Sequence, residues 1–112
     1  MFYNIPFKYT VVLLHLSARL NIIQVEDMKK RLSPFVEQSH IHIILDFQDV
    51  RMVDCSMIGF LVMFNRKLKV NHSVLTLRNL KGHAKLIFDT LKLSAVIHIE
   101  EKKNCNMIFI DI

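Results

Sequence analysis

One stretch of the chain decides the fold: Ile43-Ile44-Leu45-Asp46-Phe47-Gln48-Asp49-Val50-Arg51-Met52-Val53-Asp54-Cys55-Ser56-Met57-Ile58-Gly59. Its first part ends an apolar run, Ile41–Phe47, that predicts a strand lying under helices. A short apolar link follows, and Cys55–Val70 is long and apolar enough for a buried helix. Asp54 is placed to cap that helix by accepting hydrogen bonds from its free N–H groups. Ser56 then lies in the first turn, beside the positive end of the helix dipole.

Strand-like and helix-like segments alternate on both sides of this stretch. Four more segments have the apolar or β-branched character of strands: Phe2–Phe7, Tyr9–Leu16, Ser73–Leu77 and Ala95–Ile99. The second of these is predicted to be a buried strand. Two more helices are predicted, one over Gln24–Val36, which Pro34 kinks or ends, and one along the apolar stripe Leu80, Ala84, Ile87 and Leu91. This order predicts an α/β fold, with a mixed β-sheet of four to five strands and helices packed mainly on one face.

The start of the predicted Cys55–Val70 helix carries a recognisable motif. Asp54-Cys55-Ser56-Met57-Ile58-Gly59 resembles the Asp-Ser-Ser-Gly-Leu-Gly motif of the STAS domain family, the bacterial anti-sigma factor antagonists. Upstream, Leu16-Ser17-Ala18-Arg19-Leu20-Asn21 is similar to the family's Leu-x-Gly-Arg-Leu-Asp. The resemblance extends from Val11 to Ile99, and both the motif and the order of the elements support a STAS-like domain.

The resemblance implies a function as a protein–protein switch. Ser56 occupies the position of the family's phosphorylated serine. The unmodified protein is expected to bind an anti-sigma factor that is also a serine kinase, and phosphorylation is expected to end that binding. The partner-binding surface is expected to contain Ser56 together with Arg19, Asn21, Asp54, Cys55, Met57 and Ile58.

Four residues depart from the family pattern. Met57 replaces the glycine that follows the phosphorylated serine, and its long side chain is expected to crowd a kinase or partner. Asn21 replaces an aspartate, Ala18 a glycine and Cys55 the first serine. The missing glycine, and the obstacle that Met57 would be to phosphorylation of Ser56, keep open an alternative, in which the chain is a small cytoplasmic STAS subunit of a phospholipid-transport ABC system and binds its ATPase permanently.

Composition sets the remaining expectations. A chain of 112 residues is predicted to form one domain, residues 1–112. The formal charge of +5 is spread out, without a nucleic-acid-binding motif, so no nucleic-acid partner is expected. The apolar runs are too short to span a bilayer, and the start of the chain does not read as a signal peptide, so we expect a cytoplasmic protein with no membrane insertion.

No catalytic site is predicted. The two cysteines and six histidines show no metal-ligand spacing, and no glycine-rich phosphate loop is present, so we expect no metal, no cofactor and no enzymatic activity. Met107–Ile112 indicates either an additional edge strand or a contact in a homodimer.

Overall fold

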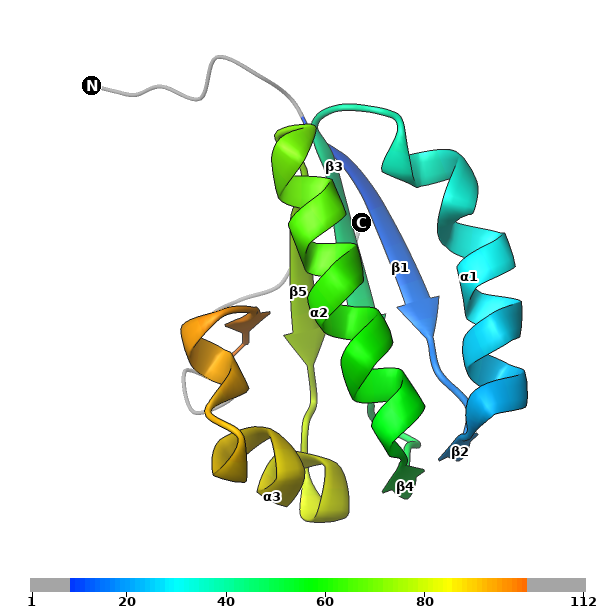
Figure 1. Cartoon of the computed structure of the whole chain (residues 1–112), viewed down its shortest axis with the longest axis vertical. Helices are drawn as coiled ribbons and strands as arrows, with labels where there is room; N and C mark the ends of the chain where they lie inside the picture. The colour runs from blue at the N-terminus through cyan, green and yellow to red at the C-terminus, as the bar shows by residue number, and fades with distance from the viewer. Residues whose placement is uncertain (1–8, 101–112) are drawn as a thin grey trace.

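The computed structural model describes residues 9–100, and its helices lie against a parallel sheet (Figure 1). The predicted strands Phe2–Phe7 and Met107–Ile112 lie outside the described residues. The elements in chain order are β1 (Thr10–His15), β2 (Arg19–Leu20), α1 (Ile22–Val36), β3 (Ile41–Asp46), β4 (Met52–Val53), α2 (Cys55–Val70), β5 (Val74–Arg78), α3 (Gly82–Thr90), the 3-10 helix η1 (Leu93–Ala95) and β6 (His98–Ile99).

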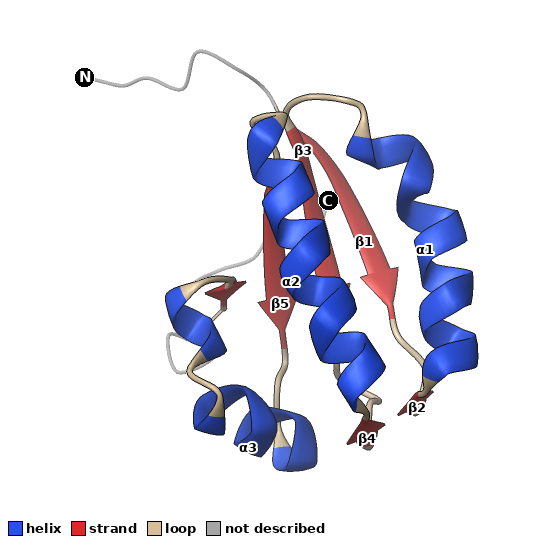
Figure 2. Cartoon of the chain, viewed as in Figure 1, coloured by secondary structure: helices blue, strands red, loops and turns tan. Residues whose placement is uncertain are grey.

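The main sheet has four strands in the order β1-β3-β5-β6, and all of its neighbouring strands run parallel (Figure 2). Leu45 in β3 pairs with Leu14 on one side and with Leu77 on the other. Because the strands are parallel, their carboxyl ends meet at one edge, where open α/β sheets usually bind their ligands. The predicted fold class, an α/β fold with four to five strands and helices mainly on one face, is confirmed, but the sheet within residues 9–100 is parallel throughout rather than mixed.

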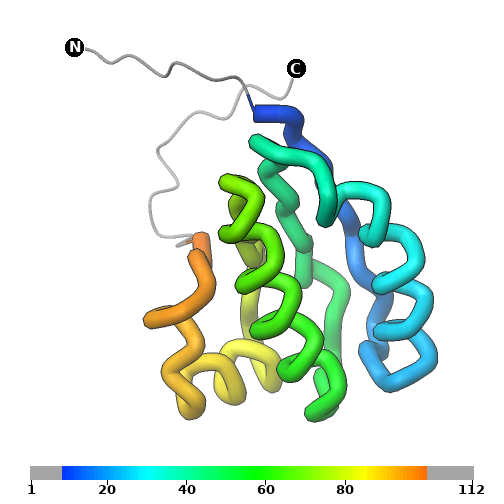
Figure 3. The backbone as a smooth tube through the Cα atoms, turned by 45° about the horizontal axis from the view of Figure 1, so that its top comes forward, coloured from blue at the N-terminus to red at the C-terminus, as the bar shows by residue number. Residues whose placement is uncertain are grey.

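The two faces of the sheet differ in burial. Helices α1 and α2 lie side by side over one face, as Figures 1 and 3 both show. The residues of β3 and β5 that point toward these helices, Ile43, Leu45, Leu75 and Leu77, are at most 1% exposed. On the opposite face Val11 and Leu13 of β1 are 58% and 55% exposed. The prediction of a buried strand over Tyr9–Leu16 is therefore wrong for one face of the strand, because β1 is an edge strand of the described sheet and the two helices cover only its other face.

Several element boundaries follow directly from the sequence. Helix α2 has the predicted bounds Cys55–Val70, and α1 ends at Val36 as predicted, two residues after Pro34. A proline at position 34 supplies no N–H for the Lys30 carbonyl, and the Ser33 hydroxyl donates to that oxygen instead, at 3.4 Å.

Other boundaries were set by caps and packing. Helix α1 begins at Ile22, two residues earlier than predicted, because Asn21 caps it. The third helix covers only Gly82–Thr90, so Leu91 follows it and is exposed. The strand predicted over Ala95–Ile99 is shortened to His98–Ile99, since the chain first forms η1.

Candidate functional site

A two-stranded sheet brings together the starts of the two long helices. Strand β2 pairs in parallel with β4, so that Arg19 lies opposite Met52 and Leu20 opposite Val53. The Arg51 N–H donates to the Ala18 carbonyl at 2.8 Å and continues this pairing into the loop. Helix α1 starts two residues after Leu20 and helix α2 two residues after Val53, so the two helix starts lie next to each other. The sequence predicted only a link at this place.

Asp54 and Ser56 form a hydrogen-bonded pair at the start of α2. The Asp54 carboxylate caps the helix by accepting a hydrogen bond from the Ser56 N–H at 3.1 Å. The Ser56 hydroxyl donates to the same Asp54 oxygen at 2.5 Å. Ser56 is half-buried and Asp54 is exposed, so the hydroxyl stands at the surface in the first helical turn. The predicted cap is confirmed, as is the position of Ser56.

Asn21 and Arg19 lie at the neighbouring helix start. The Asn21 side-chain oxygen caps α1 by accepting from the Ile23 N–H at 3.0 Å and from the Gln24 N–H at 3.4 Å. Arg19 is exposed in β2. The pairing of β2 with β4 therefore brings Arg19 and Asn21 to the same end of the molecule as Asp54, as the sequence predicted.

Met57 is not part of this surface. Its side chain is 0% exposed and belongs to the hydrophobic core. The expectation that Met57 crowds a partner at the surface is therefore wrong for its side chain, because the helical rotation from Ser56 turns the next residue toward the sheet. Cys55 is exposed and carries a free thiol, and Ile58 is half-buried against the core.

A histidine between two carboxylates lies at the carboxyl ends of β1 and β3. The Nδ1 of His15 is 3.2 Å from Asp46, and its Nε2 is 2.8 Å from Asp49. Asp46 also accepts a hydrogen bond from the Asn79 amide at 2.9 Å. Sequence reasoning missed this cluster, because His15 and Asn79 are each more than 30 residues from the aspartates that they bind. The usable signal was that His15 and Asp46 end adjacent parallel strands.

This arrangement shifts two pKa values in opposite directions. The hydrogen bond to Asp49 is the main cause that raises the pKa of His15, and the charges of both carboxylates add to it. Partial burial acts to raise the pKa of Asp46. The hydrogen bonds from Asn79 and from the Gln48 N–H, together with His15, outweigh burial and lower it. The cluster therefore favours a protonated His15 next to an ionised Asp46, and the hydrogen bond to Asp49 ties the end of β1 to the loop that leads to α2.

The surface beside the two helix starts is basic. A pocket of about 580 Å³ is lined by Arg19, Arg51 and Lys81, with the exposed side chain of Met52 and the His15-bound Asp49. None of the ion pairs found within residues 9–100 involves these three cations. A surface of this kind attracts acidic groups of a partner.

The described residues were also searched for a metal site and for a membrane-spanning helix. Within residues 9–100, no group of three or more His, Cys, Asp or Glu side chains is arranged to hold a metal ion. No helix in that range has the length and the apolar character needed to cross a membrane.

Comparison with known proteins identifies the family of this chain. The family model of the STAS domain matches residues 3–104, so the chain belongs to the STAS domain family. No curated protein matches the chain by sequence.

Solved structures with the same fold include the anti-sigma factor antagonist SpoIIAA in its unphosphorylated form. That structure has a TM-score of 0.70 and 17% identity, with 95% of this chain and 96% of that chain covered. The Bacillus cell fate determinant SpoIIAA in the phosphorylated form has a TM-score of 0.66 and 18% identity over 92% and 93% of the two chains. An anti-sigma-factor antagonist (STAS) domain protein from Planctomyces limnophilus has a TM-score of 0.68 and 16% identity over 83% and 85%.

Proposed function

We propose that this STAS protein is an anti-sigma factor antagonist, a protein–protein switch that acts in the cytoplasm and has no catalytic activity of its own. Unmodified Ser56 would allow it to bind an anti-sigma factor with serine kinase activity, and phosphorylation of Ser56 would release that partner. The observation that carries the proposal is the half-buried Ser56 hydroxyl, presented in the first turn of α2 and bonded to Asp54 at 2.5 Å.

The surroundings of Ser56 support a switch controlled by charge. A phosphate there would add up to about two negative charges and would replace the hydroxyl donor that now binds Asp54. The N–H groups of the first turn favour such an anion, so the fold should tolerate it. A partner whose acidic groups face the nearby Arg19 and Arg51 would lose binding through repulsion.

The proposed contact residues are Arg19, Asn21, Asp54, Cys55 and Ile58, which lie at or next to the two adjacent helix starts. Met57 supports this surface from inside the core and has no exposed area to offer a partner. Met57 therefore no longer favours the alternative function, that of a subunit of a phospholipid-transport ABC system. That alternative becomes an outcome of the test.

The test is affinity purification of the tagged chain from its native cells, with mass spectrometry of the partners and of the Ser56 peptide. We expect an ATPase of the serine kinase type and a phosphate on Ser56. We expect Ser56→Asp to lose the partner while its circular dichroism stays that of the wild type. Ser94→Asp, at an exposed serine of η1, is the matched control and should keep the partner.

Two results would overturn the proposal. One is wild-type affinity of Ser56→Asp for the captured partner. The other is the recovery of a transporter ATPase and permease with unmodified Ser56, which would establish the alternative function.

A further inference from the structure

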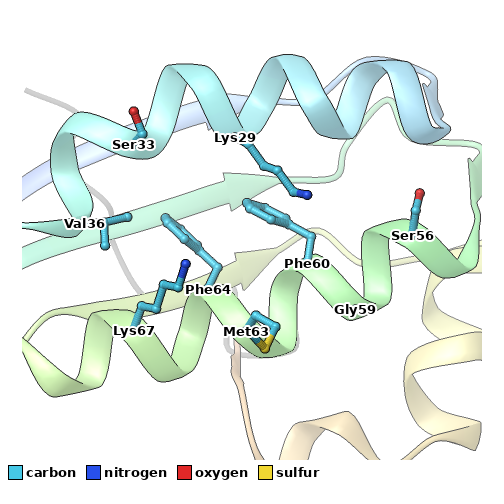
Figure 4. Close-up of a pocket in the computed structure, with 9 residues that line it drawn as sticks. All are labelled: Lys29, Ser33, Val36, Ser56, Gly59, Phe60, Met63, Phe64 and Lys67. Atoms are coloured by element: carbon cyan, nitrogen blue, oxygen red, sulfur yellow. The ribbon is translucent and has the colours of Figure 1, made fainter.

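A groove between α1 and α2 extends from Ser56, in the first turn of α2, to Lys67 near the end of that helix (Figure 4). Its volume is about 470 Å³. Its apolar part consists of Val36 from α1 and of Phe60, Met63 and Phe64 from α2. The rings of Phe60 and Phe64 are stacked, with centroids 5.1 Å apart, and both project toward α1. Met63 is 53% exposed, so the groove is open to solvent and offers apolar area to a partner.

The charged groups of the groove all have the same sign. Lys29 of α1 and Lys67 of α2 line it, and no acidic residue does. Lys29 binds Glu26 at 3.1 Å in an exposed pair three residues apart on α1, and such pairs contribute little to stability. None of the ion pairs found in residues 9–100 involves Lys67. Lys67 is therefore available to a ligand with negative charges, and Lys29 can bind such a ligand in exchange for its exposed pair with Glu26.

The dimensions of the groove favour a helix over a small ligand. Ser56 and Lys67, the outermost α2 residues that line it, are eleven residues apart, which corresponds to about 16 Å along a helix axis, or about three turns. A small-molecule site encloses most of its ligand, whereas this groove is open along its side, with about half of the Lys29 side chain and of Met63 in solvent. A third helix can place an apolar ridge between two adjacent helices.

We propose that this groove is the docking site for an amphipathic helix of the partner, whose apolar face lies on Met63 and on the exposed part of Phe60, with the buried Phe64 ring as the floor, and whose carboxylates pair with Lys29 and Lys67. The identity of the partner rests on the proposed function, whereas the chemistry of the groove does not. Ser56 lines one end of the same groove, so a phosphate there would repel the partner's carboxylates and compete with them for Lys29.

The test uses the full chain, labelled with nitrogen-15, and two synthetic peptides of about 18 residues, or about five helical turns. Both carry leucines at helical spacing on one face, flanked by glutamates in one peptide and by lysines in the other. We expect the glutamate peptide to shift the amide signals of residues 29–36 and 60–67, and the lysine peptide to leave them unchanged. Shifts by neither peptide, by both equally, or only elsewhere would overturn the proposal.

Matched variants on α2 locate the contact. We expect Lys67→Glu to weaken binding of the glutamate peptide by about fivefold, which corresponds to ~1 kcal/mol, and Met63→Asp to weaken it at least as much. Lys69→Glu makes the same charge change outside the groove, and Val70→Asp places the same charge at another exposed apolar position. Both controls should bind like the wild type. Equal losses in the controls would show a general charge effect and would contradict the proposal.

Two further results test the proposal. One distinguishes the docking of a helix from the binding of a small amphiphile, and the other distinguishes failure of the groove proposal from failure of the proposed function. Sodium laurate that produces the same shifts, with an affinity unaffected by Lys67→Glu, would identify a site for small amphiphiles and would overturn the docking of a helix. If the glutamate peptide fails to bind while Ser56→Asp still abolishes capture of the partner, the groove proposal falls and the proposed function stands. If the peptide binds as expected and no kinase partner is found, the groove stands and the proposed function falls.

Discussion

The adjacent starts of α1 and α2 solve the same structural problem with different chemistry. Each is capped by a side-chain oxygen, from Asn21 in α1 and from Asp54 in α2. The Asn21 oxygen accepts two backbone N–H groups, whereas Asp54 accepts one N–H and the hydroxyl of Ser56. In α1 the next two residues, Ile22 and Ile23, are apolar and mostly exposed.

Because of this difference, the two helix starts present different chemical groups at the surface. The start of α2 presents the hydroxyl that we propose is phosphorylated, next to the carboxylate of its cap. The start of α1 presents a neutral cap and exposed apolar side chains, which suit a partner contact. The two helices also enter the core at different points, α2 at Met57 in its third position and α1 at Val25 in its fourth. The two starts should therefore respond differently to substitution.

The largest effect is expected from the buried anchor of α2. We expect Met57→Ala to lower the free energy of unfolding by about 2–5 kcal/mol, because the side chain is fully buried and its removal leaves a cavity. Ile23→Ala, in the first turn of α1, should change it by less than about 0.5 kcal/mol, because Ile23 is 70% exposed. Urea unfolding measures both. Equal, small effects would contradict the burial of Met57.

Intermediate effects are expected from the two caps. We expect Asp54→Ala to lower the free energy of unfolding by about 1–2 kcal/mol and Asn21→Ala by about 1 kcal/mol, since Asp54 adds a favourable charge at a helix N-terminus. Asp54→Asn keeps the acceptor and should recover most of the loss. Thermal unfolding at low salt measures the differences. An Asp54→Asn variant as unstable as Asp54→Ala would show that the charge, rather than the hydrogen bond, dominates.

The smallest effect is expected from His15, which joins the strand leading toward α1 to the loop leading to α2. Its pKa is raised in the folded state, so its stabilising contribution is complete below the unfolded pKa of about 6.5 and is lost as the pH rises through the folded pKa. The effect is small because His15 and Asp49 are both exposed.

The measurement is the melting temperature of wild type and of His15→Gln between about pH 5.5 and pH 8. The wild type should melt at a higher temperature than His15→Gln at the acidic end of this range, and the difference in melting temperature should shrink toward the alkaline end. A difference that grows with pH would show that His15 is neutral in its contacts.

Local sequence signals predicted the elements that are specified by nearby residues. The predicted bounds of helix α2 agree with the structure at both ends, because its cap and its apolar composition are contiguous in the chain. The start of α1 was placed two residues late, because an Asn cap before two exposed isoleucines gives no apolar periodicity at the helix start. The shortening of the last strand was also missed, since the local apolar character does not reveal that the chain first forms η1.

The candidate site was predicted in part. The motif at Asp54–Ser56 and the run Arg19–Asn21 marked the two segments that the β2–β4 pairing brings together. The direction in which Met57 points was missed, because a motif gives residue types and not the rotation of a helix against its sheet. The basic pocket with Arg51 and Lys81 was missed as well, since its cations come from segments far apart in the chain, Arg19 from β2 and the other two from separate loops.

The sequence by itself determined the family, the alternation of strands and helices, and the Asp54 cap of α2, because these depend on residues close together in the chain. Only the tertiary structure decided which groups from distant segments meet. It placed His15 between Asp46 and Asp49, turned Met57 into the core, and formed the groove between α1 and α2. The physical reason is that such contacts depend on strand register and on helix packing, and both are fixed by burial of the whole core rather than by any local run of residues.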